Sequence, residues 1–298
     1  MTIFELVDRY FLFHVLRPES CVCYRSTATA LYKRLTTAAQ DDIRLITTEA
    51  LLRFRADLLK KGSPVSFNTH RNRLRTLFRF AIQDGCLDVT PLQRIGPAPV
   101  AEKRCKTVSV EATRLIISHL EERADDPVAR FWIAATKTLY HTGIRRRQLV
   151  GLRWGDINFE SMLMTLRSDA SKTRREWDIP FSDALLADLQ WLRNLRLEAS
   201  KVIDPEQPVF DLTLVRPSAR PLNGPTITSY YSRLSTTLGV RVSPHRFRHS
   251  FATTIVNSTG NLRVAQEWLG HADVKTTCIY INPDVGAMRS AMQHIPPL

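Results

Sequence analysis

The apolar residues of the first ninety positions recur at intervals of three and four, which is the spacing of helices that bury one face. Capping residues and prolines divide this stretch into four predicted helices. They are expected over residues 4–17, 20–37, 47–61 and 66–84. Pro18 is expected to end the first helix, and Gly62 to follow the third. The pattern therefore predicts an all-helical domain over residues 1–95.

Beyond a proline-containing linker at residues 96–108, helical spacing alternates with short apolar runs. Helices are predicted over residues 109–120, 128–141, 182–199 and 226–238, and in three short pieces after Ser243. Strands of a small antiparallel sheet are predicted over residues 157–159, 162–167 and 176–180. The second domain is thus expected over residues 109–298. The predicted fold class is mainly α with a small antiparallel β-sheet.

The length of 298 residues suits two domains, and a hydrophobic content of 44% is enough to build their cores. No apolar run is long enough to span a bilayer, and the first residues include acids instead of the basic start of a signal peptide. The five cysteines are scattered, which argues against a disulfide framework and a zinc site. We therefore expect a cytoplasmic protein with no membrane partner, metal or cofactor.

The formal net charge of +13 favours a polyanionic partner, without separating DNA from RNA or an acidic membrane. The last helix of the first domain carries Arg71, Arg75 and Arg79 at intervals of four, so these side chains form one stripe. No acidic residue along that part of the helix balances them. A solvated charged face is the alternative interpretation. Because arginine binds both phosphates and guanine edges, we predict that the stripe contacts DNA.

Two stretches near the end of the chain, SPHRFRHSFATTIV and WLGHADVKTTCIYIN, concentrate residues suited to phosphate chemistry. His245 and Arg248 are three residues apart and share one helix face. His271 and Tyr280 follow on predicted short helices that can converge on the same pocket. Arginine can clamp a phosphate, and tyrosine can attack it. The alternative is a core histidine, a surface salt bridge and a packed tyrosine.

These residues carry a resemblance to the tyrosine recombinase (phage integrase) family. HRFRH contains the His-x-x-Arg of that family, and LGHADVKTTCIY matches its closing motif, with the tyrosine nine residues after the histidine. HTGIRRRQLVGL resembles the first-arginine motif, Thr-Gly-Leu-Arg-x-x-Glu-Leu, and places Arg145 on the catalytic arginine. Gln148 stands where the family usually has an acid that would orient and charge-pair its neighbours. Glutamine can form hydrogen bonds there but cannot compensate charge.

The resemblance implies a metal-independent strand transferase in which Tyr280 is the nucleophile and forms a 3′-phosphotyrosyl intermediate. It implies that Arg145 and Arg248 clamp the phosphate, and that His245 is the general base. His271 would hydrogen-bond the phosphate. On the hairpin SKTRREWDIP the family carries its general acid, which the match assigns to Lys172 in preference to Arg174 or Arg175.

The resemblance also implies a minimal two-domain layout similar to the Xer and Cre enzymes, with a helical core-binding domain and a catalytic domain clamping DNA. The expected partners are a double-stranded recombination site and three further copies of the chain, forming a homotetramer on a Holliday junction. In solution a monomer is expected, and accessory DNA-bending or directionality factors are compatible with this layout. Integration, excision and resolution, including service to a mobile element, stay open. A type IB topoisomerase and a non-catalytic DNA-binding relative are the alternatives.

The last sixteen residues, 283–298, have an apolar pattern of their own. Val285, Met288, Met292 and Ile295 are spaced three, four and three apart, so a short helix would present one apolar stripe. A helix this short needs a surface on which to bury its stripe. The family resemblance implies docking on a neighbouring protomer, and packing on its own catalytic domain is the alternative.

Overall fold

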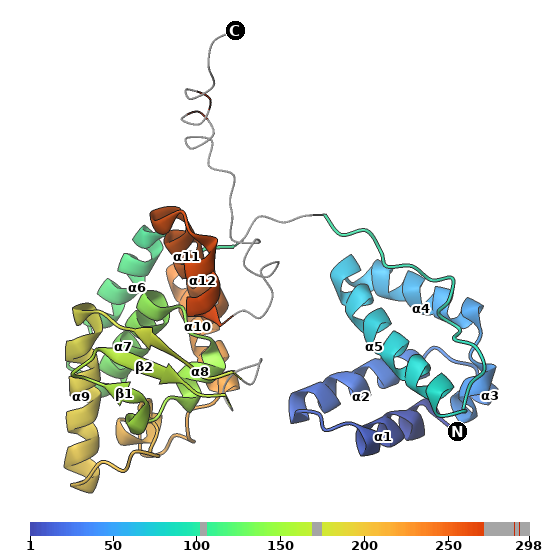
Figure 1. Ribbon diagram of the computed structural model, residues 1–298, viewed down its shortest axis with the longest axis horizontal. Helices are drawn as coiled ribbons and strands as arrows, with labels where there is room; N and C mark the ends of the chain where they lie inside the picture. Colours follow the sequence, from blue (N-terminus) through green and yellow to red (C-terminus); the bar gives the residue numbers. More distant parts are fainter. Residues whose placement is uncertain (102–105, 169–174, 271–288, 290–291, 293–298) are drawn as a thin grey trace. The chain divides into compact units, whose positions relative to one another are not determined.

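The computed structural model describes residues 1–101, 106–168, 175–270, 289 and 292 (Figure 1). The chain divides into two compact units, Met1–Lys103 and Arg104–Leu298. The described residues are mostly helical with one three-stranded antiparallel sheet, which confirms the predicted fold class. None of the helices in these ranges combines the length and the apolar composition needed to cross a membrane.

The first unit is a helical bundle in which α5 is the central element. Its elements are α1 (Ile3–Phe13), α2 (Pro18–Tyr32), α3 (Thr37–Asp41), the 3₁₀ turn η1 (Ile43–Leu45), α4 (Thr48–Lys61) and α5 (Pro64–Gln83). Helix α5 begins where the Ser63 hydroxyl accepts the backbone N–H of Ser66. Its buried Leu74, Leu77 and Phe78 then pack against α1, α2 and α4. The helical spacing of these residues therefore explains why α5 buries the face opposite its arginines.

The second helix differs from its prediction at both ends. Pro18 was expected to end the first helix, but it lies in the first turn of α2, where the missing N–H would be unsatisfied anyway. The expected extent to residue 37 is also wrong, because α2 ends at Tyr32 and α3 begins at Thr37. The Gln40 side-chain amide donates to the carbonyls of Tyr32 and Leu35, at 3.0 and 3.4 Å. These bonds tie α3 to the end of α2 and to the turn between the two helices.

The chain that follows α5 stays attached to the first unit as far as Ala98. The side-chain amide of Asn68 donates to the Ala98 carbonyl at 2.9 Å and accepts its N–H at 2.8 Å. The Arg71 Nε donates to the carbonyl of Ile95 at 2.6 Å. Ile95 and Ala98 are both buried in the core of this unit. The packed chain thus continues three residues into the stretch expected to be linker.

The second unit is organised around α7, which contacts α6, α9 and α11. Its helices are α6 (Val110–Glu121), α7 (Pro127–Thr142), α8 (Arg146–Gly151), α9 (Asp183–Ser200), α10 (Gly224–Leu238), α11 (Pro244–Thr259) and α12 (Leu262–Leu269), with 3₁₀ turns η2 (Trp154–Asp156) and η3 (Leu212–Leu214). Aromatic and polar contacts join α7 to α10: Trp132 stacks on Tyr230 with ring centroids 3.6 Å apart, and the hydroxyls of Thr136 and Tyr231 lie 2.9 Å apart. Gly260 and Gly270 end α11 and α12 with left-handed backbone, at φ of +61° and +60°.

The small sheet packs on this helical core. Its strands β1 (Ile157–Asn158), β2 (Leu163–Leu166) and β3 (Trp177–Pro180) run antiparallel in the order β1-β2-β3, as predicted. Met164 pairs with Ile157 on one side and Ile179 on the other, which places one apolar face of the sheet in the core.

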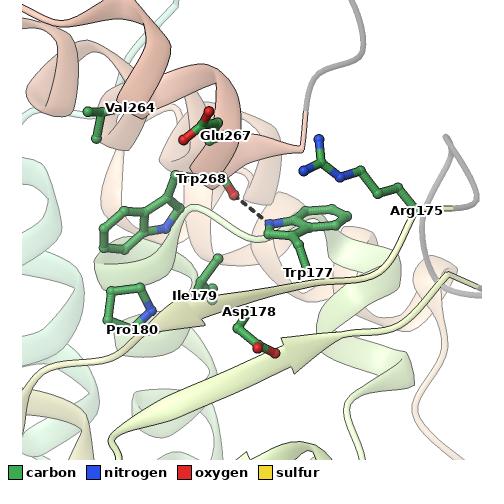
Figure 2. A pocket seen from close by; sticks show the side chains of 8 residues that line it. All are labelled: Arg175, Trp177, Asp178, Ile179, Pro180, Val264, Glu267 and Trp268. Carbon is green, nitrogen blue, oxygen red and sulfur yellow. Dashed lines mark hydrogen bonds between the residues drawn. The ribbon is translucent and has the colours of Figure 1, made fainter.

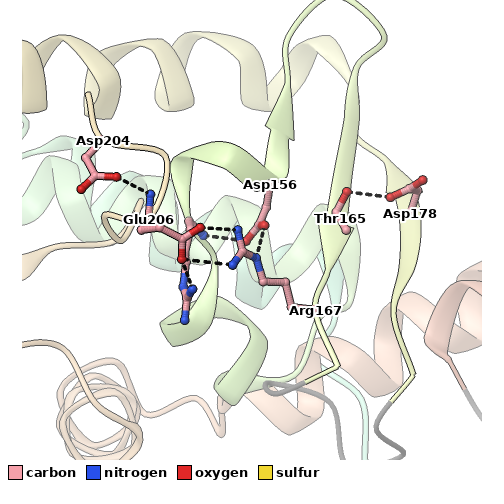
Figure 3. Close-up of polar contacts among 7 residues, drawn as sticks. Asp156, Thr165, Arg167, Asp178, Asp204 and Glu206 are labelled. Atoms are coloured by element: carbon pink, nitrogen blue, oxygen red, sulfur yellow. Dashed lines mark hydrogen bonds and ion pairs between the residues drawn. The ribbon is translucent and has the colours of Figure 1, made fainter. Parts of the chain in front are cut away.

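Ion pairs lie at the end of the β2–β3 hairpin that leads into its connecting turn (Figure 3). Arg167, directly after β2, pairs with the buried carboxylate of Asp156 and with Glu206, at 3.1 Å to Oε1. Hydrogen bonds to these two carboxylates raise the pKa of Arg167, while Arg167 lowers the pKa of Glu206. Between β2 and β3 themselves, Thr165 Oγ1 donates to Asp178 at 2.7 Å. The strands are thereby held in register where they lead toward residues 169–174.

Candidate active site

Helix α11 supplies the His-x-x-Arg pair. The Ser243 hydroxyl accepts the N–H of Arg246 at 3.3 Å, and Pro244 occupies the first turn, so the helix begins where the sequence predicted. Phe247 is fully buried and fixes which face of α11 meets α7. His245 and Arg248 follow from that orientation.

Arg248 is held by backbone carbonyls at two helix ends. Its side chain is only 3% exposed, so its guanidinium needs partners to offset desolvation. Nη1 donates to the carbonyl of Gly143, at the end of α7, at 2.9 Å. Nη2 donates to the carbonyl of Leu269, at the end of α12, at 2.8 Å. Helix ends carry partial negative charge, so both acceptors suit a cation and fix its orientation.

Two glycines with left-handed backbone make these acceptors available. Gly143 has φ of +62°, and a Cβ there would lie 2.4 Å from the Phe251 ring. Gly270, directly after Leu269, has φ of +60°, and a Cβ there would lie 2.4 Å from the Trp177 ring. Both positions therefore require glycine for conformation and for space. The Thr-Gly and Leu-Gly pairs of the motifs have this structural role in the arginine site.

Arg145, at the start of α8, binds the Leu269 carbonyl that Arg248 also binds. Its Nη1 donates to Leu269 O at 3.4 Å, so the guanidinium groups of Arg145 and Arg248 converge on one oxygen. Arg145 itself lies at the N-cap of α8, where its backbone N–H donates to Gln148 Oε1 at 2.7 Å. The structure thus brings together the two arginines that the motifs singled out.

Gln148 is buried beside Arg145, with 1% of its surface exposed. Its Oε1 caps the start of α8, a role that glutamine and glutamate fill equally well at this third helical position. Within the described residues, its Nε2 has no hydrogen-bond partner. A buried donor without a partner is costly, and a carboxylate at this place would have none to leave open.

Two histidines lie on successive turns at the start of α11. The rings of His245 and His249 meet edge to face with centroids 4.1 Å apart. Partial desolvation lowers the pKa of His245, and the charges of Arg248 and Arg145 lower it further. Burial, followed by the charges of His245, Arg248 and Arg246, lowers the pKa of His249 to about 4. Both rings are therefore neutral at neutral pH.

Lys172, His271 and Tyr280 lie outside the described residues, but the elements that lead to them are joined. Trp177 Nε1 on β3 donates to Trp268 O on α12 at 2.9 Å (Figure 2), and Trp268 Nε1 donates to Thr142 O at 3.1 Å. Beside this hydrogen bond, β3 and α12 together line a cavity of about 280 Å³. It is lined by Arg175, Trp177, Asp178, Ile179, Pro180, Val264, Glu267 and Trp268. Neither tryptophan was predicted from the sequence to be part of the site, although Trp268 begins the WLGH segment of the closing motif.

The arginine stripe of α5 is not uniform. Arg75 and Arg79 are exposed, and no ion pair or side-chain hydrogen bond within residues 1–101 engages them. Arg71 is half-buried and donates to Ile95 O. Two of the three predicted DNA contacts are thus presented to solvent, and the third also fastens the chain after α5.

Across the described parts of the chain, no group of three or more His, Cys, Asp or Glu side chains could hold a metal ion. The polar groups gathered at the ends of α7, α8, α11 and α12 are cationic or neutral donors. Such a set is suited to an anion, and a phosphate diester is the anion that two guanidinium forks match best.

Comparison with known proteins agrees with this geometry. Residues 109–286 match the phage integrase family. A putative tyrosine recombinase XerC from Pseudomonas aeruginosa is 30% identical over 98% of this chain and 71% of its own length. A second, from Pseudomonas syringae, is 30% identical over 98% of this chain and 64% of its own length.

Solved structures share the fold. The Tn1549 transposon integrase in complex with circular intermediate DNA superposes with a TM-score of 0.76 at 18% identity, covering 98% of this chain and 99% of that one. A lambda integrase dimer bound to a COC′ core site gives 0.72 at 20% identity, covering 95% and 77%. From the family match over most of the second unit and the relatives at 30% identity, the chain belongs to the phage integrase family, the tyrosine recombinases.

Proposed function

We propose that this protein is a site-specific recombinase that cuts and rejoins double-stranded DNA through a covalent bond to Tyr280. One observation carries the proposal: two guanidinium groups converge on Leu269 O, two residues before His271 and eleven before Tyr280. This closeness along the chain supports the proposal that the phosphate-binding groups and the nucleophile act in one site.

In the proposed cleavage step, the Tyr280 oxygen forms a bond to the scissile phosphorus while the bond from phosphorus to the 5′ oxygen breaks. The products are a 3′-phosphotyrosyl linkage and a free 5′-hydroxyl. The tyrosine proton goes to His245, and the 5′ oxygen takes a proton from Lys172. Attack by a 5′-hydroxyl from a partner strand reverses the step, so the bond energy is conserved in the phosphodiester.

Arg145 and Arg248 act on the charge that develops on the non-bridging oxygens. Two fixed carbonyls hold the Arg248 guanidinium through Nη1 and Nη2, so its orientation is set before a phosphate arrives. Preorganised donors of this kind stabilise a transition state without reorganisation. His245 contributes as a base because its lowered pKa keeps the ring neutral near pH 7.

Trapping of the covalent intermediate tests this proposal. DNA flanking the gene supplies candidate sites, each made as a nicked suicide substrate. We expect wild-type protein to form a covalent complex in excess EDTA, and Tyr280→Phe to bind with nearly unchanged affinity but to form none. Covalent trapping of Tyr280→Phe, or a strict requirement for added magnesium in the cleavage step, would contradict the mechanism.

The family favours recombination over the type IB topoisomerase alternative, and over a relative without catalysis. Comparing supercoil relaxation with two-site recombination distinguishes a recombinase from a type IB topoisomerase. A covalent complex that wild-type protein forms and Tyr280→Phe does not form excludes a relative without catalysis. We place this activity in the cytoplasm on chromosomal or mobile-element DNA, with integration, excision and resolution as the candidate roles.

For the synaptic complex, we propose a homotetramer of protomers that are monomeric before they bind DNA. The apolar tail, residues 283–298, docks on a neighbouring protomer and couples assembly to cleavage. The helix that would carry its apolar stripe is too short to be stable in isolation, which supports docking on another surface. Truncation after Pro283 should leave single-site binding intact in a mobility-shift assay and reduce cooperative pairing and recombination. Normal assembly of the truncated protein would rule out the exchange.

A further inference from the structure

The backbone that enters the second unit is fastened directly to helix α11. The Val108 N–H donates to the Ser250 hydroxyl oxygen at 2.7 Å, and that hydroxyl donates to the Val108 carbonyl at 2.8 Å. Both residues are buried, at 6% and 9% exposure. One serine thus satisfies both backbone groups of one residue in a place closed to water, where either group alone would be costly to leave open.

A second contact lies one turn earlier on α11. Arg246 Nη1 donates to the carbonyl of Thr107 at 3.3 Å. Residues 107 and 108 are therefore bound through side chains from two successive turns of α11. Arg248, which holds its two carbonyls, lies between those two positions in the sequence. His245 directly precedes the first of them, so the fastening includes Arg248 and begins next to His245.

The other end of the connection is fastened to the first unit. Asn68 on α5 holds Ala98 through both backbone groups, and Arg71 holds Ile95. Eight residues, 99–106, separate Ala98 from Thr107, and Pro99 is among them. Whatever path it takes, a connection of nine Cα–Cα steps spans at most about 32 Å, so separation of its two fastened ends beyond that distance pulls on both.

We propose that Ser250 is a positioning residue that ties the connection between the units to α11, so that engagement of DNA by the first unit sets the orientation of His245 and Arg248. The inference rests on the proposed function, since the effect is read in the cleavage step. Ser250 touches no reacting atom. It acts through the helix backbone, and misplacing a phosphate clamp by a fraction of an ångström is enough to slow phosphoryl transfer.

The experiment combines Ser250→Ala with a longer connection in a double-mutant cycle. Four residues, Gly-Ser-Gly-Ser, are inserted between Val100 and Ala101, both exposed. Covalent complex formation on a suicide substrate is followed in preformed complexes at saturating protein. Ser250→Thr retains the hydroxyl. Ser258→Ala is the matched control, since Ser258 is an exposed serine further along the same helix.

We expect Ser250→Ala to slow cleavage within bound complexes about tenfold and to change site affinity less than twofold. The insertion alone should slow cleavage to a similar extent, but should add less than twofold to Ser250→Ala, because the tie is already broken. Ser250→Thr should recover most of the rate, and Ser258→Ala should match wild type. Full additivity of insertion and Ser250→Ala would overturn the proposal, as would a wild-type rate for Ser250→Ala.

Hydrogen exchange of the free protein separates this inference from the proposed function. Ser250→Ala should speed exchange of amides in residues 107–110 and 244–252 at least fivefold, whereas Ser258→Ala should not. Unchanged exchange would show that the serine does not fasten the connection. Failure of wild-type protein to cleave any substrate would count against the proposed function alone, because the exchange measurement still decides whether the tie exists.

Discussion

The arginines of α11 and α8 and those of α5 have the same chemistry in opposite surroundings. Arg248 is buried, and backbone carbonyls at the ends of two helices fix its fork. Arg75 and Arg79 point from an exposed face of α5 and are engaged by no ion pair within the described first unit. The buried guanidinium loses its rotational freedom during folding, and the exposed ones lose theirs only when they bind.

This difference teaches what each set can do. A fixed fork can favour one geometry of phosphate over another, and so can stabilise a transition state more than a ground state. Mobile surface arginines favour any nearby phosphate by displacing counterions, which gives affinity with little geometric selection. The comparison therefore separates catalysis from binding, and each prediction below breaks one side of it.

The largest effect is expected from Arg248→Lys. A lysine ammonium reaches as one point of charge and cannot keep two carbonyls while also forming paired bonds to a phosphate. Cleavage on a suicide substrate should fall by about 10²- to 10³-fold, the loss typical of one preorganised donor group. Site affinity should change only a few-fold.

Arg241→Lys is the matched control, because Arg241 is exposed near the start of α11. It should cleave at the wild-type rate. If Arg248→Lys also stays within a few-fold of wild type, the fork geometry is not what stabilises the transition state, and the contrast with α5 loses its basis.

A smaller effect is expected from Gln148→Glu, which returns the acid usual in the family. The carboxylate keeps an acceptor for the Arg145 N–H but places negative charge where the amide is neutral. At present desolvation and the charges of Arg248 and Arg145 lower the pKa of His245. Offsetting Arg145 favours the imidazolium, so the pKa of His245 should rise.

The sign of the rate change follows from the proposed role of His245 as a base. Protonation removes the base, so the acidic limb of the pH–rate profile should shift to higher pH in Gln148→Glu. Cleavage should fall severalfold at pH 6 and change little at pH 8. His245→Gln should remove that limb altogether. A limb that moves to lower pH in Gln148→Glu would mean that the residue acts otherwise than through charge.

Periodicity predicted most helices because one face of each is buried, as α5 and α11 illustrate. It failed at α2, which ends at Tyr32, where the Gln40 side chain donates to the carbonyls of Tyr32 and of Leu35 in the turn that follows. Local spacing does not include such a bond from eight residues ahead. Likewise, the motifs identified Arg248, but its acceptors lie 105 and 21 residues away in the sequence. Lys172, His271 and Tyr280 stay predictions from motif and spacing.

The smallest effect, and the one that tests the exposed side of the comparison, is expected from Arg75→Ala and Arg79→Ala. Each phosphate contact contributes about 0.9 to the slope of log K against log salt concentration, so the pair should lower that slope by about two. Arg53→Ala, an exposed arginine on α4, should leave the slope unchanged. Arg71→Ala should instead loosen residues 95–98, seen as faster amide exchange, because its Nε holds Ile95.

Fluorescence anisotropy from 50 to 300 mM salt measures the slope. Cleavage in saturated complexes should be unaffected by the pair, since mobile surface charge adds affinity and not transition-state geometry. An unchanged slope in the double variant would show that the stripe is a solvated face. The exposed arginines of α5 would then serve solubility, in contrast to the buried Arg248.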